Sequence, residues 1–270
     1  MNRRIILAAA VLLMAAPPAS AMSITSNTTW SGTVRVKREV VVEKGVTLTI
    51  MPGTTVTFAP GRPDQAGLAD TGLLVKGAIV AEGRPGARIT FTSGAARPRP
   101  GDWGEIRIFA SKGSSVSQCD FSCGGWGLHI HDSVMKVTGC TFRYNRFGGI
   151  RGKGMGLEVS GCLLTGLDIG IRYWQGSPTI RGCTITANRT GIFFRQGCEG
   201  AVVKANNIFG NSDYDFKLGE AQTADVDLTG NWWGSADAGR IRKKIFDKAR
   251  DNYIGRALIE PVLAGRAEAP

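Results

Sequence analysis

The sequence predicts an all-β solenoid, a chain wound into stacked coils of short strands. In the second half of the chain one phrase repeats: an aliphatic residue, two small or polar residues, Cys or Asn, one free position and a large apolar residue. The Cys or Asn recurs at spacings of 21, 22, 21, 23 and 25 residues, at Cys119, Cys140, Cys162, Cys183, Asn206 and Asn231. Elsewhere apolar residues alternate at a period of two, with glycine and proline between the runs. A repeat near 21 residues that keeps several positions in register is typical of a solenoid.

The first residues predict export. Arg3 and Arg4 precede an apolar run over residues 5–16, and Ala19-Ser20-Ala21 offers a small-x-small cleavage site. The run is shorter than the ~20 apolar residues that cross a membrane. We therefore expect a signal peptide at residues 1–21, no membrane span in the mature chain, and a periplasmic or extracellular location.

The composition is basic, with 33 Lys and Arg against 22 Asp and Glu. Removal of the two signal arginines leaves 31 against 22, a net charge of +9. The expected partner of a basic exported protein is an anionic polysaccharide or another envelope polymer, with envelope proteins as further candidates. Export argues against nucleic acid as the partner. The alternative is that the charge serves solubility alone.

Short strands are expected along the chain from Thr33. They lie near residues 33–37, 40–42, 46–50, 55–58, 73–75, 79–81, 89–91 and 106–108, with exposed loops at 61–69 and 97–102. From Val34 to Trp233 the pattern gives about eight coils. At ~4.8 Å per coil they would form a rod about 40 Å tall.

The Cys and Asn positions are expected to form one file inside the solenoid. Parallel side chains in such a file keep their Cβ atoms further apart than a relaxed disulfide prefers, so we expect buried free thiols. Cys123 and Cys198 lie outside the register, and their pairing is left open. Five positions after the file come corner residues that should take the left-handed conformation. They are Gly124, Asn145, Asn188 and Asn211.

Residues 236–270 are expected to form a C-terminal cap and tail. Asp237 can cap a helix in which Ile241, Ile245 and Ala249 recur every four residues, opposite a basic face. Such a helix would cover the open end of the core. Residues 258–263 should lie extended against the last coil.

These repeats resemble those of right-handed parallel β-helix proteins of the pectin-lyase-like class, from about Thr33 to Trp233. The segment at 46–54 looks like the entry segment of exported bacterial members, and Asn231-Trp-Trp-Gly-Ser235 is similar to their terminal segment. The resemblance implies a right-handed parallel β-helix at residues 22–235, with about eight coils and a short C-terminal capping helix. The class includes lyases, hydrolases, epimerases and adhesins, so the resemblance implies no single function.

In polysaccharide-active members, the resemblance implies, one sheet forms the floor of the substrate groove. If its apolar positions from Ile106 to Phe216 point inward, the residues after them point outward. One outward file is then Arg107, His129, Arg151, Arg172, Phe193 and Lys217, and the next is Phe109, His131, Lys153, Trp174 and Arg195. Cations suit carboxylate or sulfate groups, and aromatic faces suit sugar rings. We predict that an anionic polysaccharide binds the following: Arg107, His129, His131, Arg151, Lys153, Arg172, Trp174, Arg195 and Lys217. A merely solvated basic face is the alternative.

The sequence leaves open whether the chain is an enzyme. Polygalacturonase-like hydrolases of this class carry paired aspartates before these strands, and at the matching positions only Asp168 is acidic. An acidic cluster for a calcium-dependent lyase is not evident. A metal site at His129 and His131 would lack a further ligand, so no metal and no cofactor are predicted.

The candidate catalytic residues are His131, Asp132 and Lys153. The segment Leu128-His-Ile-His-Asp132 resembles the Asp-Pro-His-Asp segment of mannuronan epimerases, without its first aspartate and its proline. A histidine beside an aspartate can transfer protons. A polyuronate epimerase or lyase is therefore one alternative to a binding protein. A non-catalytic structural or assembly protein of the cell envelope is the other.

Overall fold

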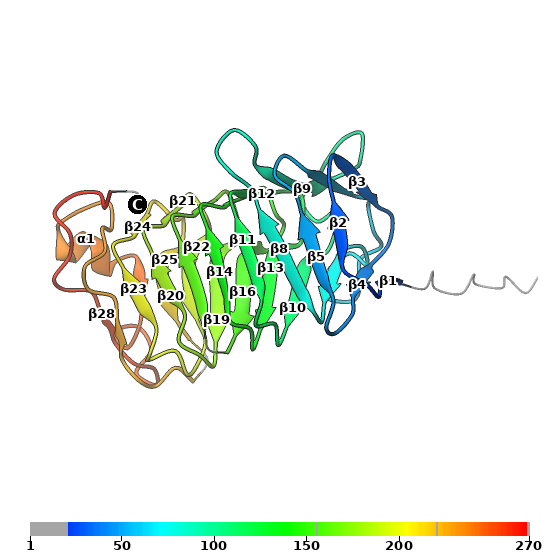
Figure 1. The fold of residues 1–270 in the computed structure, drawn as a ribbon. Coiled ribbons are helices and arrows are strands. Elements are labelled where there is room, and N and C mark those ends of the chain that lie inside the picture. Colours follow the sequence, from blue (N-terminus) through cyan, green and yellow to red (C-terminus); the bar gives the residue numbers. More distant parts are fainter. Residues whose placement is uncertain (1–20, 155, 220, 269–270) are drawn as a thin grey trace, which may run out of the picture.

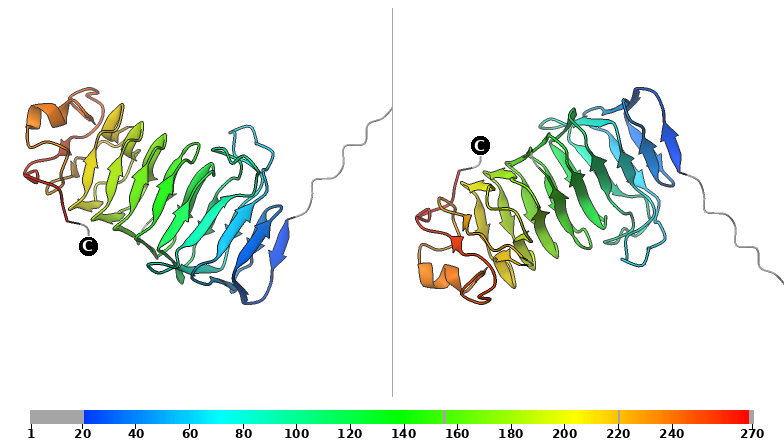
Figure 2. Two further views of the ribbon diagram at one scale, coloured as in Figure 1. Left: turned by 90° about the horizontal axis from the view of Figure 1, so that it is seen from above. Right: turned by 90° about the horizontal axis from the view of Figure 1, so that it is seen from below.

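The computed structural model describes residues 21–154, 156–219 and 221–268. Almost every element in these residues is a short strand, and the strands wind into coils stacked along one axis (Figure 1). Each complete coil contributes one strand to each of three parallel sheets, here named A, B and C. Views from above and below show the same rod, with β1 at one end and the helix α1 at the other (Figure 2).

The strands are short and follow the order A, B, C along the chain. Sheet A contains β1 (Met22–Ile24), β4 (Val40–Val42), β7 (Leu73–Val75), β10 (Ile106–Phe109), β13 (Trp126–His131), β16 (Gly148–Lys153), β19 (Ile169–Trp174), β22 (Thr190–Phe194), β25 (Tyr214–Leu218) and β27 (Ile245–Phe246). Sheet B contains β2 (Thr28–Trp30), β5 (Thr47–Ile50), β8 (Ala78–Glu82), β11 (Ser114–Ser117), β14 (Met135–Thr138), β17 (Leu157–Ser160), β20 (Thr179–Arg181) and β23 (Val202–Lys204). Sheet C contains β3 (Thr33–Val36), β6 (Thr55–Phe58), β9 (Ile89–Ser93), β12 (Cys119–Phe121), β15 (Thr141–Arg143), β18 (Leu163–Thr165), β21 (Thr184–Thr186) and β24 (Asn207–Phe209).

The predicted all-β solenoid is confirmed. Within the described residues, β1 to β24 make eight complete coils, and β25 begins a ninth. The expected signal peptide, residues 1–21, lies outside the described residues apart from Ala21. The described part of the chain contains no helix with the length and apolar character needed to cross a membrane.

The core fills the inside of the coils with side chains stacked in register. Phe121 pairs with Phe91 on one side and with Phe142 on the other. All three rings are fully buried, and their centroids are 4.9 and 4.7 Å apart at interplanar angles of 10° and 5°. These separations match the spacing of neighbouring strands, so the sheet itself sets the stacking distance.

The Cys and Asn file lies inside the corner between sheets B and C. All six cysteines are free and buried, which confirms the expected interior thiols. The Cys162 Sγ accepts the N–H of Cys140 at 3.4 Å, and the Asn206 Oδ1 accepts the N–H of Cys183 at 2.9 Å. A thiol and an amide therefore fill the same place in successive coils. Burial raises the pKa of the Cys198 thiol to about 12, so it stays protonated at neutral pH.

The prediction for the corner between sheets C and A was wrong by one residue. The left-handed residues are Cys123, Tyr144, Ala187 and Gly210, each directly before a predicted corner residue. The asparagines that follow are buried and serve as hydrogen-bond partners instead. The Asn188 Oδ1 accepts the Leu167 N–H at 3.1 Å, and its Nδ2 donates to the Leu164 carbonyl at 3.0 Å. Buried backbone groups need such partners, so these asparagines form a ladder that joins the coils.

Asp215 ends this asparagine ladder. Its Oδ1 accepts the Asn211 N–H at 3.1 Å and the Asn211 Nδ2 at 2.8 Å, and the residue is 3% exposed. Burial raises the pKa of Asp215 to about 6, against the opposing effects of Asn211 and Lys244. The folded state therefore holds this proton more tightly than the unfolded state, whose aspartates titrate near pH 3.9. The charged carboxylate lowers stability above pH 6, and this cost disappears as the pH falls below about 4.

We predict that Asp215→Asn raises the free energy of unfolding by about 1–3 kcal/mol at pH 8, because the amide keeps the acceptor and removes the charge. At pH 3.5 the gain should be small, since the carboxyl is then neutral in both states. Chemical denaturation of the two proteins at both pH values checks this. An equal gain at both pH values would contradict the assignment.

The C-terminal cap is present, but its helix is shorter than the sequence pattern predicts. The helix α1 (Ala238–Arg242) follows Asp237, whose side chain accepts the N–H groups of Gly239 and Arg240. Ile245 does not extend the helix; it lies in β27 and pairs with Phe216 of β25. The unpaired edge of β25 outweighs the local helical pattern, because β27 supplies the backbone partners that this edge lacks.

The segment that follows the cap lies extended against the last coil, as predicted. The strand β28 (Ala257–Leu258) pairs with β26 (Val226–Asp227). Beyond it, the Pro261 carbonyl accepts the Gly230 N–H at 2.7 Å, and the Leu263 N–H donates to the Asn231 carbonyl at 3.0 Å.

Candidate functional site

Sheet A carries two rows of cations and aromatic rings on its outer surface, which we call the sheet A face. The strands β10, β13, β16, β19, β22 and β25 pair in parallel register. The first row is Arg107, His129, Arg151, Arg172, Phe193 and Lys217. The second row is Phe109, His131, Lys153 and Trp174, continued by Arg195, whose N–H bonds the Tyr173 carbonyl. The structure thus brings all nine predicted binding residues onto one face.

A buried carboxylate, Glu105, lies at the N-terminal half of this face with its side chain 2% exposed. Its Oε1 accepts the His129 Nδ1 at 2.9 Å and the Arg151 Nη2 at 2.8 Å, and its Oε2 accepts the Arg151 Nε at 3.0 Å. Arg107 lies next to it and also forms an ion pair with Glu39. Burial alone would raise the pKa of Glu105, but His129 and Arg151 together hold it below its usual value. Glu105 is therefore ionised at neutral pH.

The two histidines continue this network toward the surface. The Nε2 atoms of His129 and His131 are 2.5 Å apart, and their rings meet edge to face. Because Glu105 is ionised, His129 donates from Nδ1, so its Nε2 accepts the Nε2 proton of His131. The Nδ1 of His131 then carries a lone pair.

Both histidines are neutral at neutral pH. Burial lowers the pKa of His129, although Glu105 opposes it, and Arg151 and Arg107 lower it further. Burial, followed by the charges of His129 and Lys153, lowers the pKa of His131 to about 4. A neutral imidazole at the surface can accept a proton.

Aromatic rings enclose His131 on two sides. Phe109 stacks on it with centroids 4.8 Å apart, and Trp174 meets it edge to face at 5.7 Å. Lys153 lies between them in the register, because it pairs with His131 on one side and with Trp174 on the other. The N-terminal end of the second row therefore places an imidazole, an ammonium group and two aromatic rings on neighbouring strands.

The C-terminal half of the face pairs its cations with rings. The Arg172 guanidinium is 5.6 Å from the Phe193 ring centroid. The Lys217 Nζ lies 5.2 Å from the same ring and 5.1 Å from Phe246. The aromatic surfaces help to hold these cations in place.

The repeating register and the parallel strands agree with a comparison against protein families. Residues 102–232 match the family model described as a right handed beta helix region. This part of the chain is a right-handed β-helix. Comparison with curated proteins and with solved structures returns no match. The β-helix fold is consistent with a carbohydrate-related or a structural role, and it does not specify a reaction.

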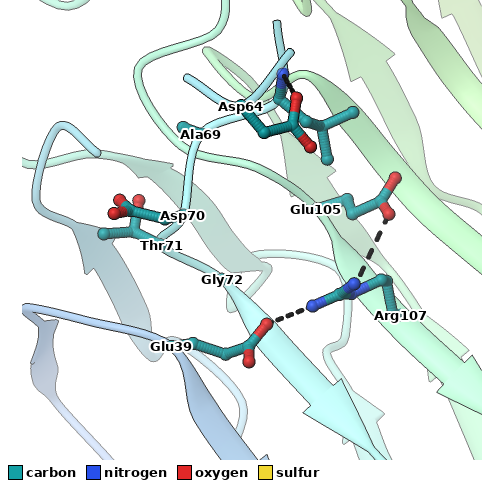
Figure 3. A pocket seen from close by; sticks show the side chains of 9 residues that line it. Glu39, Asp64, Ala69, Asp70, Thr71, Gly72, Glu105 and Arg107 are labelled. Atoms are coloured by element: carbon teal, nitrogen blue, oxygen red, sulfur yellow. Dashed lines mark hydrogen bonds and ion pairs between the residues drawn. The ribbon is translucent and has the colours of Figure 1, made fainter. Parts of the chain in front are cut away.

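At the N-terminal end of the sheet A face, the β-helix has a cavity of about 210 Å³ beneath the loop between β6 and β7. Figure 3 shows Arg107 between Glu39 and Glu105 at its base, with Asp64 and Asp70 on the loop side. The Asp64 Oδ1 accepts N–H groups of its own loop, from Ala66 and Leu68. With four carboxylates in its lining, this cavity is a poor site for an anion.

The contacts of the candidate catalytic residues differ from the expected histidine–aspartate pair. The hydrogen bond of His131 goes to His129, while exposed Asp132 lies 3.9 Å from the Lys153 Nζ. His131 and Lys153 come together on the face, and Asp132 lies at its edge as a partner of Lys153. Among the residues that the structure describes, no group of three or more His, Cys, Asp or Glu has an arrangement suited to a metal ion.

Sequence reasoning missed Glu105 and Glu39. The register pairs Val40 with Leu73 and Leu73 with Ile106, so both glutamates directly precede residues of one column. The position before the inward residue is glycine in the four coils from Leu128 to Ile192, so the regular part of the repeat gives no sign of a carboxylate there. One coil toward the N-terminus the same position is Glu105.

Proposed function

We propose that the chain binds an anionic polysaccharide through the sheet A face, and that the principal contacts come from its C-terminal half. The observation that carries this proposal is the alternation of cations and rings across three neighbouring strands, Arg172 and Lys217 on either side of Phe193. A guanidinium pairs with carboxylate or sulfate groups through two hydrogen bonds, and ring faces suit the C–H surfaces of sugars.

The distribution of carboxylates supports this choice of half. Arg107 and Arg151 already pair with Glu39 and Glu105, so an anionic ligand would have to compete for them. Lys217 packs instead against the rings of Phe193 and Phe246. The N-terminal half is better suited to hold one sugar unit in a defined position than to attract the polymer.

The repeat supports a linear ligand. Neighbouring strands place equivalent residues about 4.8 Å apart along the axis of the rod. A polymer that runs along this axis would meet a cation or a ring on each strand. A small molecule would not need such a repeated series of contacts. The predicted export of the chain would bring it to such polymers.

We predict that the mature protein is retained on immobilised polygalacturonate at low salt and elutes as the salt concentration rises. The double variant Arg172→Ala/Lys217→Ala should bind about tenfold or more weakly, because two charge-assisted contacts are lost. Binding is measured on the column and as a dissociation constant in solution.

A matched variant separates a specific face from net charge. Arg143→Ala/Arg181→Ala removes the same charge from exposed positions on sheets C and B, and it should bind like the unchanged protein. Immobilised neutral dextran should retain none of them. Equal weakening by the two double variants, or no retention of the unchanged protein at low salt, would contradict the proposal.

A further inference from the structure

We propose that the corner between sheets A and B docks the protein on an anionic phospholipid surface. The docking site is a groove over the third coil, which we call the corner groove, together with the exposed side chain of Val134 beside it. The cations that line the corner groove are Lys44, Lys76 and Lys112. The inference does not depend on the proposed polysaccharide binding, because neither Arg172 nor Lys217 takes part in it.

The corner groove follows from unequal corner lengths. The corners after β4 and β10 contain four residues each, whereas the corner after β7 contains only two. The Lys76 N–H donates to the Val42 carbonyl of the second coil at 2.9 Å, and the Ala110 N–H donates to the His131 carbonyl of the fifth coil at 2.9 Å. The short third corner is therefore the floor of the groove, and the longer corners on either side are its walls. The enclosed volume is about 550 Å³.

Each of these three corners contributes one lysine to the groove, and all three lysines are exposed. Because coils lie ~4.8 Å apart, the three cations fall within about 10 Å along the axis. Glu43 pairs with Lys76 at 3.2 Å. Three positive charges against one negative charge leave an excess of two. A groove with such an excess concentrates anions from solution.

The positive patch is short along the axis of the rod. Asp132 is exposed in the corner of the next coil, where its carboxylate lies 3.9 Å from the Lys153 Nζ. At the other end Glu43 directly precedes Lys44. A linear polyanion would meet these carboxylates as soon as it left the groove. A compact anion such as a phosphate fits between the ammonium groups, which bind phosphate as point charges.

Apolar groups lie beside the cations. Val46, Ala78 and Phe109 contribute to the lining of the groove. Val134 is 56% exposed in the neighbouring corner, and its N–H donates to the Ser111 carbonyl of the groove wall at 2.9 Å. Cations next to exposed apolar groups suit the boundary between lipid headgroups and hydrocarbon. A phosphate joined to hydrocarbon is the chemistry of a phospholipid, so the combination favours a lipid surface over free phosphate.

The test is co-sedimentation of the mature protein with vesicles made of phosphatidylcholine and phosphatidylglycerol in equal parts, at about 0.1 M salt. The protein should bind these vesicles and bind vesicles of phosphatidylcholine alone far more weakly. The triple variant Lys44→Ala/Lys76→Ala/Lys112→Ala should bind more than tenfold more weakly, because each lysine near an anionic surface adds to the affinity.

A matched triple variant, Arg143→Ala/Arg181→Ala/Lys248→Ala, removes the same charge from exposed positions elsewhere on the rod. It should weaken vesicle binding less than about threefold, since charges far from the contact are screened. Both triple variants should keep the free energy of unfolding of the unchanged protein, because the replaced side chains are exposed.

Val134→Ser tests the apolar contact at unchanged charge. It should weaken vesicle binding about threefold or more. This loss should persist as the salt concentration rises, whereas the effect of the lysine substitutions should shrink. Inorganic phosphate, compared with chloride at the same ionic strength, should not release the bound protein.

The outcomes separate the alternatives. Equal weakening by the two triple variants, or equal binding to vesicles of phosphatidylcholine alone, would overturn the docking site. Release by inorganic phosphate would assign the corner groove to free phosphate and overturn the lipid surface. Full binding of Val134→Ser would overturn the apolar contact.

Polygalacturonate retention distinguishes this proposal from the proposed function. The lysine variant should remain on the polygalacturonate column, and Arg172→Ala/Lys217→Ala should still bind the vesicles. If the lysine variant lost both vesicle binding and column retention, the lysines would act through general charge, and the specific docking site would be overturned.

Discussion

Phe121→Ala is expected to lower the free energy of unfolding by about 3–5 kcal/mol. Phe121 is fully buried between Phe91 and Phe142, so its removal leaves a cavity with a ring on either side. The coils can close this gap only by shifting all three sheets, because each coil is paired to its neighbours on three sides. Urea or guanidinium denaturation measures the loss.

The control for this substitution is Tyr253→Ala. Tyr253 is 83% exposed, and its removal should change the free energy of unfolding by less than about 0.5 kcal/mol. Similar values for the two variants would mean that the phenylalanine stack contributes little to stability.

Glu105→Ala is expected to cost about 2–4 kcal/mol at pH 7, because it leaves Arg151 and His129 without the carboxylate that they share. This loss of unfolding free energy is smaller than the usual cost of breaking a fully buried ion pair, because the Arg151 side chain is 23% exposed and gains some hydration. The pKa of Glu105 is lowered in the folded state, so its contribution is present above about pH 4.3 and is lost as the pH falls through the lowered value.

Denaturation at pH 7 and pH 3 tests this substitution, with a larger difference between the unchanged protein and the variant expected at pH 7 than at pH 3. The double variant Glu105→Ala/Arg151→Ala should lose less than the sum of the single variants, because the second change removes the unpaired cation. Additive losses would show that the two side chains do not act as one unit.

The regular part of the fold follows from the sequence because its coils have nearly equal length. Leu128, Ile150, Ile171 and Ile192 lie 21 or 22 residues apart and pair in one column of sheet A. Once one member is placed inside, strand alternation fixes which residues face outward. The two rows of the sheet A face follow directly from this rule.

The network around Glu105 could not be predicted in the same way. The coils that begin at Val40 and Leu73 each contain 33 residues before the next residue of the column, because long loops are inserted. A repeat of about 21 residues therefore does not describe the N-terminal coils. The partners are also far apart in the chain, with 46 residues between Glu105 and Arg151 and 68 between Glu39 and Arg107. Which carboxylate meets which cation depends on side-chain reach across coils.

The C-terminal helix α1 shows the opposite case. Its local sequence pattern was clear, but the pattern predicted a longer helix than the structure contains. The spacing of Ile241, Ile245 and Ala249 suits one face of a helix, but the last strand of sheet A needs a backbone partner. Ile245 serves that need in β27. The sequence around Ile245 does not show that the open edge of β25 will lie beside it in the folded chain.

The four interior thiols impose an order on maturation. Cys119, Cys140, Cys162 and Cys183 lie 21 or 22 residues apart, a separation at which loop closure in an unfolded chain costs little. An unfolded chain in an oxidising compartment would readily join such thiols, whereas the folded chain keeps them all free and buried. The predicted export therefore requires that winding of the coils outpace oxidation, so that each coil that docks withdraws one more thiol from the competing cross-links.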